Sequence, residues 1–258
     1  MPEGDTIFRT AATLDRWLAR RPITAARTTA PVPIGLLVGD TVTEVDARAK
    51  HLLMRFASGR VLHTHMQMTG SWHVYPAGAR WRRPAGRARV VLEAGERVAV
   101  CFDAPVVELL APGGELRHPA IAALGPDVLV EPLDVAGVVA RSRERPPETE
   151  IGELLLDQRV VGGIGNIYRS EALFLTGVHP RRRASDVDVG AVVTAAANLM
   201  RASAGLEAAR GTRPAHVSTL YVYRRAGRPC RRCGTRIEAA RVGAQARTAY
   251  WCPRCQPA

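Results

Sequence analysis

The spacing of hydrophobic residues divides the chain into two parts. Between residues 5 and 21, apolar residues recur every three or four positions, which predicts a helix that Pro22 ends. Residues 34–110 instead contain short apolar and β-branched runs separated by glycine and proline turns. These runs are residues 41–45, 52–56, 61–65, 90–92 and 98–102. The first part is therefore predicted to be a β-sandwich or barrel-like domain with a helix at its start.

Beyond residue 110 the pattern becomes helical. Residues 112–134 are interrupted by proline and glycine, as is typical of a hinge between domains. Helices are predicted next, and strand-like pieces return near the C-terminus. The predicted helices are residues 151–158, 168–175 and 187–201, and the strand-like pieces are residues 221–223 and 248–251. We divide the chain into residues 1–117, a hinge at 118–134, a helical domain at 135–219 and a C-terminal module at 220–258.

Four of the five cysteines lie in the C-terminal module in two pairs. Cys230 and Cys233 are followed, after 18 residues, by Cys252 and Cys255. This spacing is typical of a structural zinc ion held by four thiolates, with no coordination position left for catalysis. Cys101 lies alone in an apolar run and is most simply a core residue.

The charge balance indicates a polyanionic partner. Lys plus Arg number 36 against 24 Asp plus Glu, a formal net charge of +12. Such an excess favours nucleic acid, although an inert basic surface gives the same count. No stretch reaches the roughly 20 apolar residues of a membrane span, and the first residues are unlike a secretory signal. We expect a cytoplasmic protein that has no membrane partner.

Two amines are available for covalent chemistry. Lys50 is the only lysine among the 36 basic residues, and removal of Met1 would expose Pro2 as an N-terminal secondary amine. An α-amino group has a pKa of about 7.7–8.0 against ~10.4 for lysine, so a usable fraction is neutral near pH 7. A secondary amine forms a charged iminium with a sugar aldehyde. Glu3 is placed to be a general acid or base, or simply to complement a helix dipole.

Two further positions are candidates for binding phosphate. Residues 162–166 read Gly-Gly-Ile-Gly-Asn and lie between two predicted helices, where such a turn can hold a phosphate with Asn166 as a donor. An ordinary helix–helix corner fits equally well. In the C-terminal module, residues 236–242 and 247–251 can form a hairpin with Arg247 near its tip. Taken alone, Arg247 is more simply a solvated arginine.

Several motifs occur together in one order along the chain. They are Met-Pro-Glu-Gly at residues 1–4, Lys-His-Leu-Leu at 50–53, Leu-Leu-Asp-Gln at 155–158, Gly-Ile-Gly-Asn-Ile-Tyr at 163–168 and the C-terminal cysteine pairs. With these motifs the whole chain resembles the formamidopyrimidine-DNA glycosylase and endonuclease VIII family of DNA repair enzymes. The resemblance implies an α+β fold, in which an N-terminal β-sandwich with flanking helices is followed by a helix-two-turn-helix domain and a zinc β-hairpin finger.

The resemblance also implies a role for each candidate residue. Pro2 is the nucleophile that attacks C1′ of a damaged nucleotide, Glu3 is the proton donor that helps to open the sugar, and Lys50 assists the first elimination. Asn166 belongs to a phosphate clamp, and Arg247 takes part in DNA binding and the second elimination. The implied protein is a base excision repair enzyme that acts as a monomer on damaged DNA of the bacterial nucleoid. It removes the base and nicks the strand by β,δ-elimination.

The substrate expectation depends on the branch of the family. Residues 65–72 resemble the endonuclease VIII loop that fills the gap left by an everted nucleotide, with Gln67 and Met68 as wedge residues; a strand end with core-facing methionines is the alternative. Residues 102–108 lack the Arg-Arg-Phe element of the formamidopyrimidine branch. Oxidised pyrimidines are therefore the expected substrates. The competing interpretations are a glycosylase for oxidised purines and a noncatalytic zinc-finger DNA-binding protein.

Two positions depart from the family pattern. Thr6 stands where both branches carry glutamate, and Ala123 stands where endonuclease VIII has a basic phosphate contact. With these departures the chain resembles an actinobacterial-type subgroup of endonuclease VIII. The two amines and Glu3 are unaffected by them.

Overall fold

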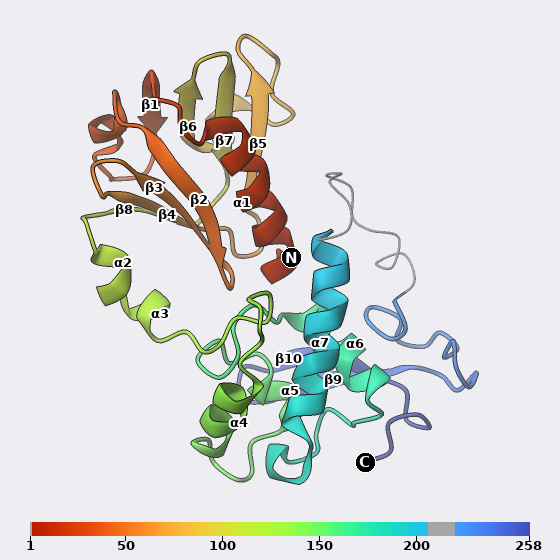
Figure 1. The fold of residues 1–258 in the computed structure, drawn as a ribbon. Coiled ribbons are helices and arrows are strands. Elements are labelled where there is room, and N and C mark those ends of the chain that lie inside the picture. The colour runs from red at the N-terminus through yellow and green to blue at the C-terminus, as the bar shows by residue number, and fades with distance from the viewer. Residues whose placement is uncertain (1, 206–219) are drawn as a thin grey trace. The chain divides into compact units, whose positions relative to one another are not determined.

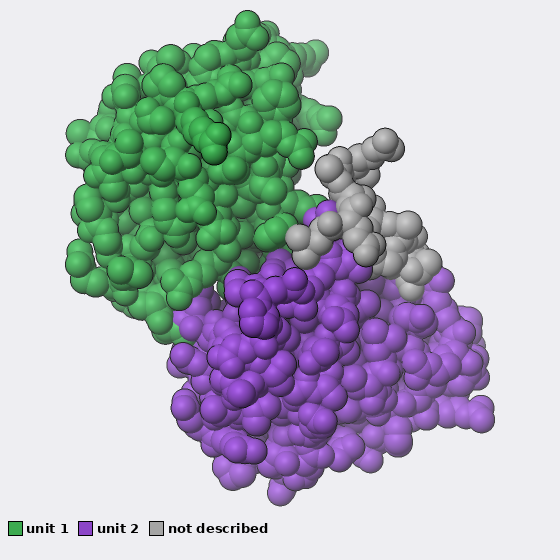
Figure 2. Space-filling model, viewed as in Figure 1, with its two compact units in different colours: residues 1–123 green, residues 124–258 purple. Residues whose placement is uncertain are grey.

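The computed structural model describes residues 2–205 and 220–258. The chain forms two compact units, Met1–Ala123 and Leu124–Ala258 (Figure 2). Of the predicted helical domain at 135–219, residues 206–219 lie outside the described part. No helix in the described ranges is long and apolar enough to cross a membrane.

Unit 1 is a sandwich of two antiparallel four-stranded sheets, which confirms the predicted fold class (Figure 1). One sheet has the order β2-β3-β4-β8 and the other β1-β6-β7-β5. The strands are β1 (Ala25–Thr28), β2 (Val42–Arg48), β3 (His51–Phe56), β4 (Val61–His65), β5 (Ser71–Pro76), β6 (Ala88–Ala94), β7 (Arg97–Phe102) and β8 (Val106–Leu110). All five predicted strands are present, whereas β1, β5 and β8 were not predicted.

Helix α1 (Gly4–Leu18) packs its apolar stripe against the sandwich. Asp15 Oδ1 accepts a hydrogen bond of 2.9 Å from the backbone N–H of Val45, which ties the helix to β2. The helix ends one turn earlier than predicted because Arg20 adopts a φ of 64° and donates its N–H to Val42. The start of the chain is thus held against the sheet that carries Lys50.

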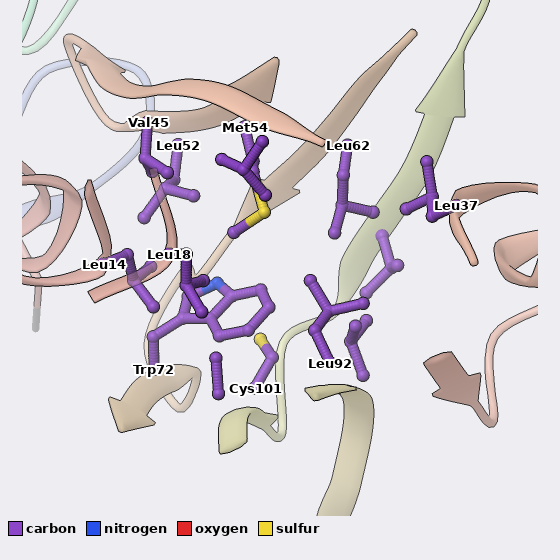
Figure 3. Close-up of a cluster of buried hydrophobic side chains, with 14 of the residues drawn as sticks. Leu14, Leu18, Leu37, Val45, Leu52, Met54, Leu62, Trp72, Leu92 and Cys101 are labelled. Carbon is purple, nitrogen blue, oxygen red and sulfur yellow. The ribbon is translucent and has the colours of Figure 1, made fainter. Parts of the chain in front are cut away.

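The sandwich core joins both sheets and α1 (Figure 3). Its largest members include Leu14, Leu52, Trp72 and Leu92. The indole N–H of Trp72 is satisfied inside this core by a 3.0 Å hydrogen bond to Thr64. Cys101 is fully buried there, and burial raises the pKa of its thiol, in agreement with the predicted structural role.

The predicted hinge and the loops of unit 1 contain short helices. They are the 3₁₀ turns η1 (Ile34–Leu37) and η2 (Ala85–Arg87) and the single-turn helices α2 (Gly114–Arg117) and α3 (Pro119–Ala122). Pro119 begins α3, where its missing N–H costs no hydrogen bond.

Unit 2 contains a helical part and a β-hairpin (Figure 1). Helix α7 packs against α4 and α6, and the hairpin strand β10 packs against α6. The elements are α4 (Val135–Arg143), α5 (Ile151–Leu154), α6 (Asn166–Leu175), η3 (Ala184–Asp186), α7 (Val189–Ala204), β9 (Glu238–Val242) and β10 (Arg247–Trp251). The predicted helices at 168–175 and 187–201 and the hairpin are present, while α4 was not predicted.

The predicted helix at 151–158 is wrong in length because its last residues brace the glycine turn instead. The side chain of Gln158 accepts a 3.0 Å hydrogen bond from the N–H of Gly163 and donates at 3.1 Å to the carbonyl of Ile164. Gly163 has a φ of 97°, which only glycine adopts without strain. Gln158 therefore supports the turn that leads into α6.

The predicted strand at 221–223 is also wrong. The buried carboxylate of Glu171 on α6 accepts the backbone N–H groups of Tyr221, Val222 and Tyr223, at 2.8, 3.0 and 2.8 Å. Those donors are consequently unavailable to a sheet. Burial raises the pKa of Glu171, and the three hydrogen bonds oppose that rise.

Candidate active site and nucleic-acid interface

Glu3 lies at the N-cap of α1 and is almost completely buried, with 1% of its surface exposed. Its backbone carbonyl accepts the N–H groups of Thr6 and Ile7, at 2.9 and 3.1 Å, so the helix begins directly after it. Pro2, which precedes it, is half-buried. The burial distinguishes Glu3 from a solvated carboxylate that only complements a helix dipole, and it places an acid next to the predicted nucleophile.

The first turn of α1 contains a second acid. Asp5 is buried and forms an ion pair of 3.3 Å with Arg9. Thr6 donates its hydroxyl to Asp5 at 3.4 Å. At the position where the family pattern has glutamate, this chain thus places a hydroxyl that bonds to a neighbouring carboxylate.

Lys50 lies in the tight turn between β2 and β3, one residue before His51. The turn requires a φ of 55° at Ala49, whose side chain is buried. Lys50 is half-buried. Burial lowers the pKa of both His51 and His65, and the charge of Lys50 adds to that lowering. The lysine and these two rings therefore share one part of unit 1.

The two methionines in the loop between β4 and β5 differ in their exposure to solvent. Met66 is buried in the sandwich core, whereas Met68 has 61% of its surface exposed. Gln67 between them has a φ of 44°, a strained value for a residue with a side chain. At Gly70 a Cβ atom would lie 2.8 Å from the carbonyl oxygen of Met66, so glycine is required there. The loop therefore presents Gln67 and Met68 outward while Met66 anchors it.

Three residues that were not singled out in the sequence hold this loop. Asp103 accepts hydrogen bonds from Arg83 at 2.6 Å and from Arg87 at 2.8 Å, and its backbone carbonyl accepts the hydroxyl of Thr69 at 3.1 Å. The bonds from Arg87 and Arg83 hold the pKa of Asp103 below its usual value. Only the crowding of arginines at residues 80–89 was a signal of this contact in the sequence.

In unit 2, Asn166 is the first residue of α6 and joins the helix to the hairpin. Its amide group donates to the carbonyl of Thr248 on β10 at 2.9 Å, and its carbonyl accepts from Arg169. Arg169 is fully buried and also donates to Thr248 at 2.7 Å and to Gly152 at 3.2 Å. Arg169 could not be singled out from the sequence, because its contact with Thr248 spans 79 positions.

Arg247 is the first residue of β10, next to the hairpin tip, and is exposed as expected. The tip is fastened by Gly243, whose N–H donates to Glu150 at 2.9 Å. A cavity of about 1000 Å³ lies between residues 145–159 and the hairpin. Its basic lining consists of Arg145, Arg159, Arg181, Arg241 and Arg247.

The four C-terminal cysteines come together in one cluster. All four Sγ atoms lie within 4.8 Å of one another, with 3.4 Å between Cys233 and Cys252 and 4.0 Å between Cys230 and Cys255. Tetrahedral zinc with bonds of about 2.3 Å needs sulfur atoms roughly 3.8 Å apart. The cluster therefore fits one structural zinc ion, as predicted.

Comparison with known proteins accounts for nearly the whole chain. Residues 1–105 match the formamidopyrimidine-DNA glycosylase N-terminal domain, residues 124–213 its H2TH domain, and residues 227–258 the zinc finger found in FPG and IleRS. The chain belongs to the formamidopyrimidine-DNA glycosylase and endonuclease 8 family. This family comprises DNA glycosylases and abasic-site lyases, so the enzyme class expected from the sequence is confirmed.

Individual relatives and a solved structure are similar to the chain over almost its whole length. The chain is 40% identical to "Probable endonuclease 8 2" of Streptomyces coelicolor, over 99% of this chain and 94% of the relative. It is 37% identical, over 100% of both chains, to a DNA-(apurinic or apyrimidinic site) lyase of Mycolicibacterium smegmatis. The fold matches a Lactococcus lactis Fpg crystallised with DNA containing N7-benzyl-Fapy-dG, with a TM-score of 0.85 at 22% identity and 100% coverage of both chains.

We predict that Cys252→Ser abolishes zinc binding and, with it, binding to DNA. Cys252 is fully buried and belongs to the same apolar cluster as Phe174 of α6, so losing the metal also loosens the packing of the finger on that helix. Zinc content by elemental analysis and affinity for a lesion duplex measure the two effects. A metal-free protein that binds DNA with full affinity would contradict this prediction.

Proposed function

We propose that the protein is a bifunctional DNA glycosylase and abasic-site lyase of base excision repair that removes oxidised pyrimidines. The observation that carries this proposal is the buried Glu3 directly beside the N-terminal Pro2, on the unit that also carries Lys50 and the outward loop of Gln67 and Met68. The lyase and endonuclease 8 names of the relatives support it. The protein is proposed to act as a monomer on nucleoid DNA in the cytoplasm.

The proposed chemistry begins at Pro2. Its nitrogen attacks C1′ of the everted nucleotide, the glycosidic bond breaks, and the damaged base leaves with the bonding electrons. Glu3 gives a proton to the ring oxygen of the sugar, so that the sugar opens and the Pro2 nitrogen becomes an iminium. Loss of a C2′ proton, assisted by Lys50, then expels the 3′ phosphate, and a second elimination expels the 5′ phosphate.

Unit 2 is proposed to hold the DNA backbone. The N-terminus of α6 favours an anion through its helix dipole, and Asn166 lies at that terminus. The side chain of Asn166 is hydrogen-bonded to Thr248 and to Arg169. Asn166 therefore also holds strand β10, whose first residue is Arg247. Arg247 is exposed and charged, which suits a phosphate contact and assistance to the second elimination.

The proposed division of the chain follows these roles. Residues 1–117 form the catalytic domain, residues 118–134 the hinge, residues 135–219 the helix-two-turn-helix domain and residues 220–258 the zinc finger. Ala123 lies in the proposed hinge and offers no charge, so the phosphate contact made there in endonuclease VIII is missing.

The substrate class is tested with duplexes that each contain one defined lesion. We expect faster strand scission at thymine glycol and 5-hydroxyuracil than at 8-oxoguanine. The outward Gln67 and Met68 and the absence of an Arg-Arg-Phe element in residues 102–108 support that order. Product formation under single-turnover conditions gives the ranking, and a clear preference for 8-oxoguanine would move the protein to the purine branch.

The nucleophile is tested by trapping. Borohydride added during reaction with abasic-site DNA reduces an iminium to a stable amine, so we expect a covalent adduct that peptide mapping places on Pro2. Lys50 is the only alternative amine among the side chains of this sequence, which makes the mapping decisive. A label on Lys50 would identify it as the nucleophile. The absence of any adduct would favour a noncatalytic DNA-binding protein.

Arg247→Ala tests the proposed backbone contact. Losing one phosphate contact should weaken binding to every lesion alike and reduce the log–log salt slope by about 0.9 for duplex DNA. If Arg247 also assists the second elimination, the β-elimination product should accumulate at the expense of the δ-product. Affinities at several salt concentrations and a gel that resolves both products provide the measurement. An altered lesion ranking with an unchanged salt slope would instead mean that Arg247 contacts the base.

A further inference from the structure

Three histidines and a glutamate form a hydrogen-bonded chain in the β2-β3-β4-β8 sheet and the segment after it, and a fourth histidine packs against its end. Nδ1 of His51 lies 2.8 Å from Nε2 of His63, and Nδ1 of His63 lies 2.7 Å from Oε2 of Glu108. The same carboxylate oxygen lies 3.0 Å from Nε2 of His118, and the ring of His65 lies 4.8 Å from that of His51. The sheet register explains the arrangement, since His63 is directly opposite Glu108 and His65 directly opposite His51.

The direction of each hydrogen bond follows from Glu108. Hydrogen bonds from His63 and His118 outweigh the effect of burial and hold the pKa of Glu108 below its usual value, so it is ionised near pH 7 and only accepts. His63 therefore donates through Nδ1. Burial lowers the pKa of His63, so its neutral ring carries no second proton, and Nε2 must accept from Nδ1 of His51.

The same reasoning fixes the state of His51. Its single ring proton is on Nδ1, which leaves Nε2 as an acceptor. Burial, followed by the charges of His65, His63, His118 and Lys50, lowers its pKa to about 3. Lys50, whose charge contributes to that lowering, directly precedes His51 in the chain.

We propose that Glu108 and His63 are positioning residues that act on Lys50 through His51. In this arrangement the carboxylate fixes the His51 ring as the neutral Nδ1–H form, and Nε2 of that ring accepts a hydrogen bond from the Lys50 ammonium group. His51 is also the first residue of β3, so its bond to His63 holds the turn that carries the lysine. The proposal rests on the proposed function of Lys50 in the first elimination.

A bound metal is a poorer explanation of the cluster. His63, Glu108 and His118 could offer three donor atoms within 4.8 Å of one another. Yet Nδ1 of His118 is buried without a hydrogen-bond partner, whereas a metal-binding histidine needs an acceptor for its second nitrogen.

Glu108→Gln tests the proposal because it keeps the shape of the side chain and removes its charge. We expect β-elimination on abasic-site DNA under single-turnover conditions to slow about tenfold, the lower end of what a hydrogen bond to a charged group contributes. DNA affinity and borohydride trapping on Pro2 should stay at the wild-type level. ¹⁵N spectra of the imidazoles should show His51 as the Nδ1–H form in the wild type and as a mixture in Glu108→Gln.

Two controls separate positioning from a general effect of altered packing. His118→Gln removes the other donor to Glu108 but leaves the path to His51, so elimination should be unchanged. His73→Gln is the matched control for His63→Gln, because His73 is a half-buried histidine on the other sheet whose Nε2 lies 3.2 Å from the hydroxyl of Ser71. His63→Gln should slow elimination as Glu108→Gln does, and His73→Gln should not.

The outcomes distinguish this proposal from the proposed function. Wild-type protein that forms no adduct with abasic-site DNA would overturn the lyase chemistry itself. Normal trapping together with wild-type elimination in both Glu108→Gln and His63→Gln would overturn only the positioning role. An Nε2–H form of His51 in the wild type, or a slow His118→Gln variant, would do the same.

Discussion

Hydrogen bonds of buried polar side chains hold several of the functional segments in place. Leaving a buried donor or acceptor unpaired costs about 1–3 kcal/mol, more than a typical paired bond contributes. In unit 2 the buried guanidinium of Arg169 and the buried carboxylate of Glu171 therefore bind the backbone of distant segments. In unit 1 the buried ring of His63 is paired at both nitrogens. The apolar cores stabilise the fold, and these hydrogen bonds determine where the segments that they bind are held.

The fold was predictable from the sequence wherever local pattern and burial agree. The runs at 52–56 and 61–65 are β-rich and apolar and form central strands of a sheet, and both were predicted. Strand β1 was not predicted, because its four residues are too few to show a period. At residues 221–223 the local pattern favours a strand, but Glu171, 50 positions away along the chain, takes the backbone donors. The helix predicted at 151–158 is too long for a similar reason, because the side chain of Gln158 hydrogen-bonds to the glycine turn.

The candidate site shows the same limit. Local motifs singled out Pro2, Glu3, Lys50 and Asn166 as candidates and located the zinc cysteines, because each motif combines a polar group with the turn or helix start that presents it. Arg169 and Asp103 carry no motif, and two of their contacts, to Thr248 and Arg83, span 79 and 20 positions of the sequence. Glu108 and His63 are 45 positions apart and meet only because β4 and β8 are neighbours in the sheet. A single sequence indicates candidate groups that lie in local motifs and misses groups whose contacts form only in the fold.

The two units differ in how they place their charged and titratable side chains. In unit 1, burial lowers the pKa of His51 to about 3 and that of His65 to about 4, so both rings are neutral near pH 7 and do not repel Lys50. In unit 2 Arg247 is left exposed next to the hairpin tip, while Arg169 is buried in its support. An exposed arginine can replace its bound water with a phosphate at little cost in free energy. A buried arginine that turned towards a phosphate would leave the backbone carbonyl groups it binds without a partner.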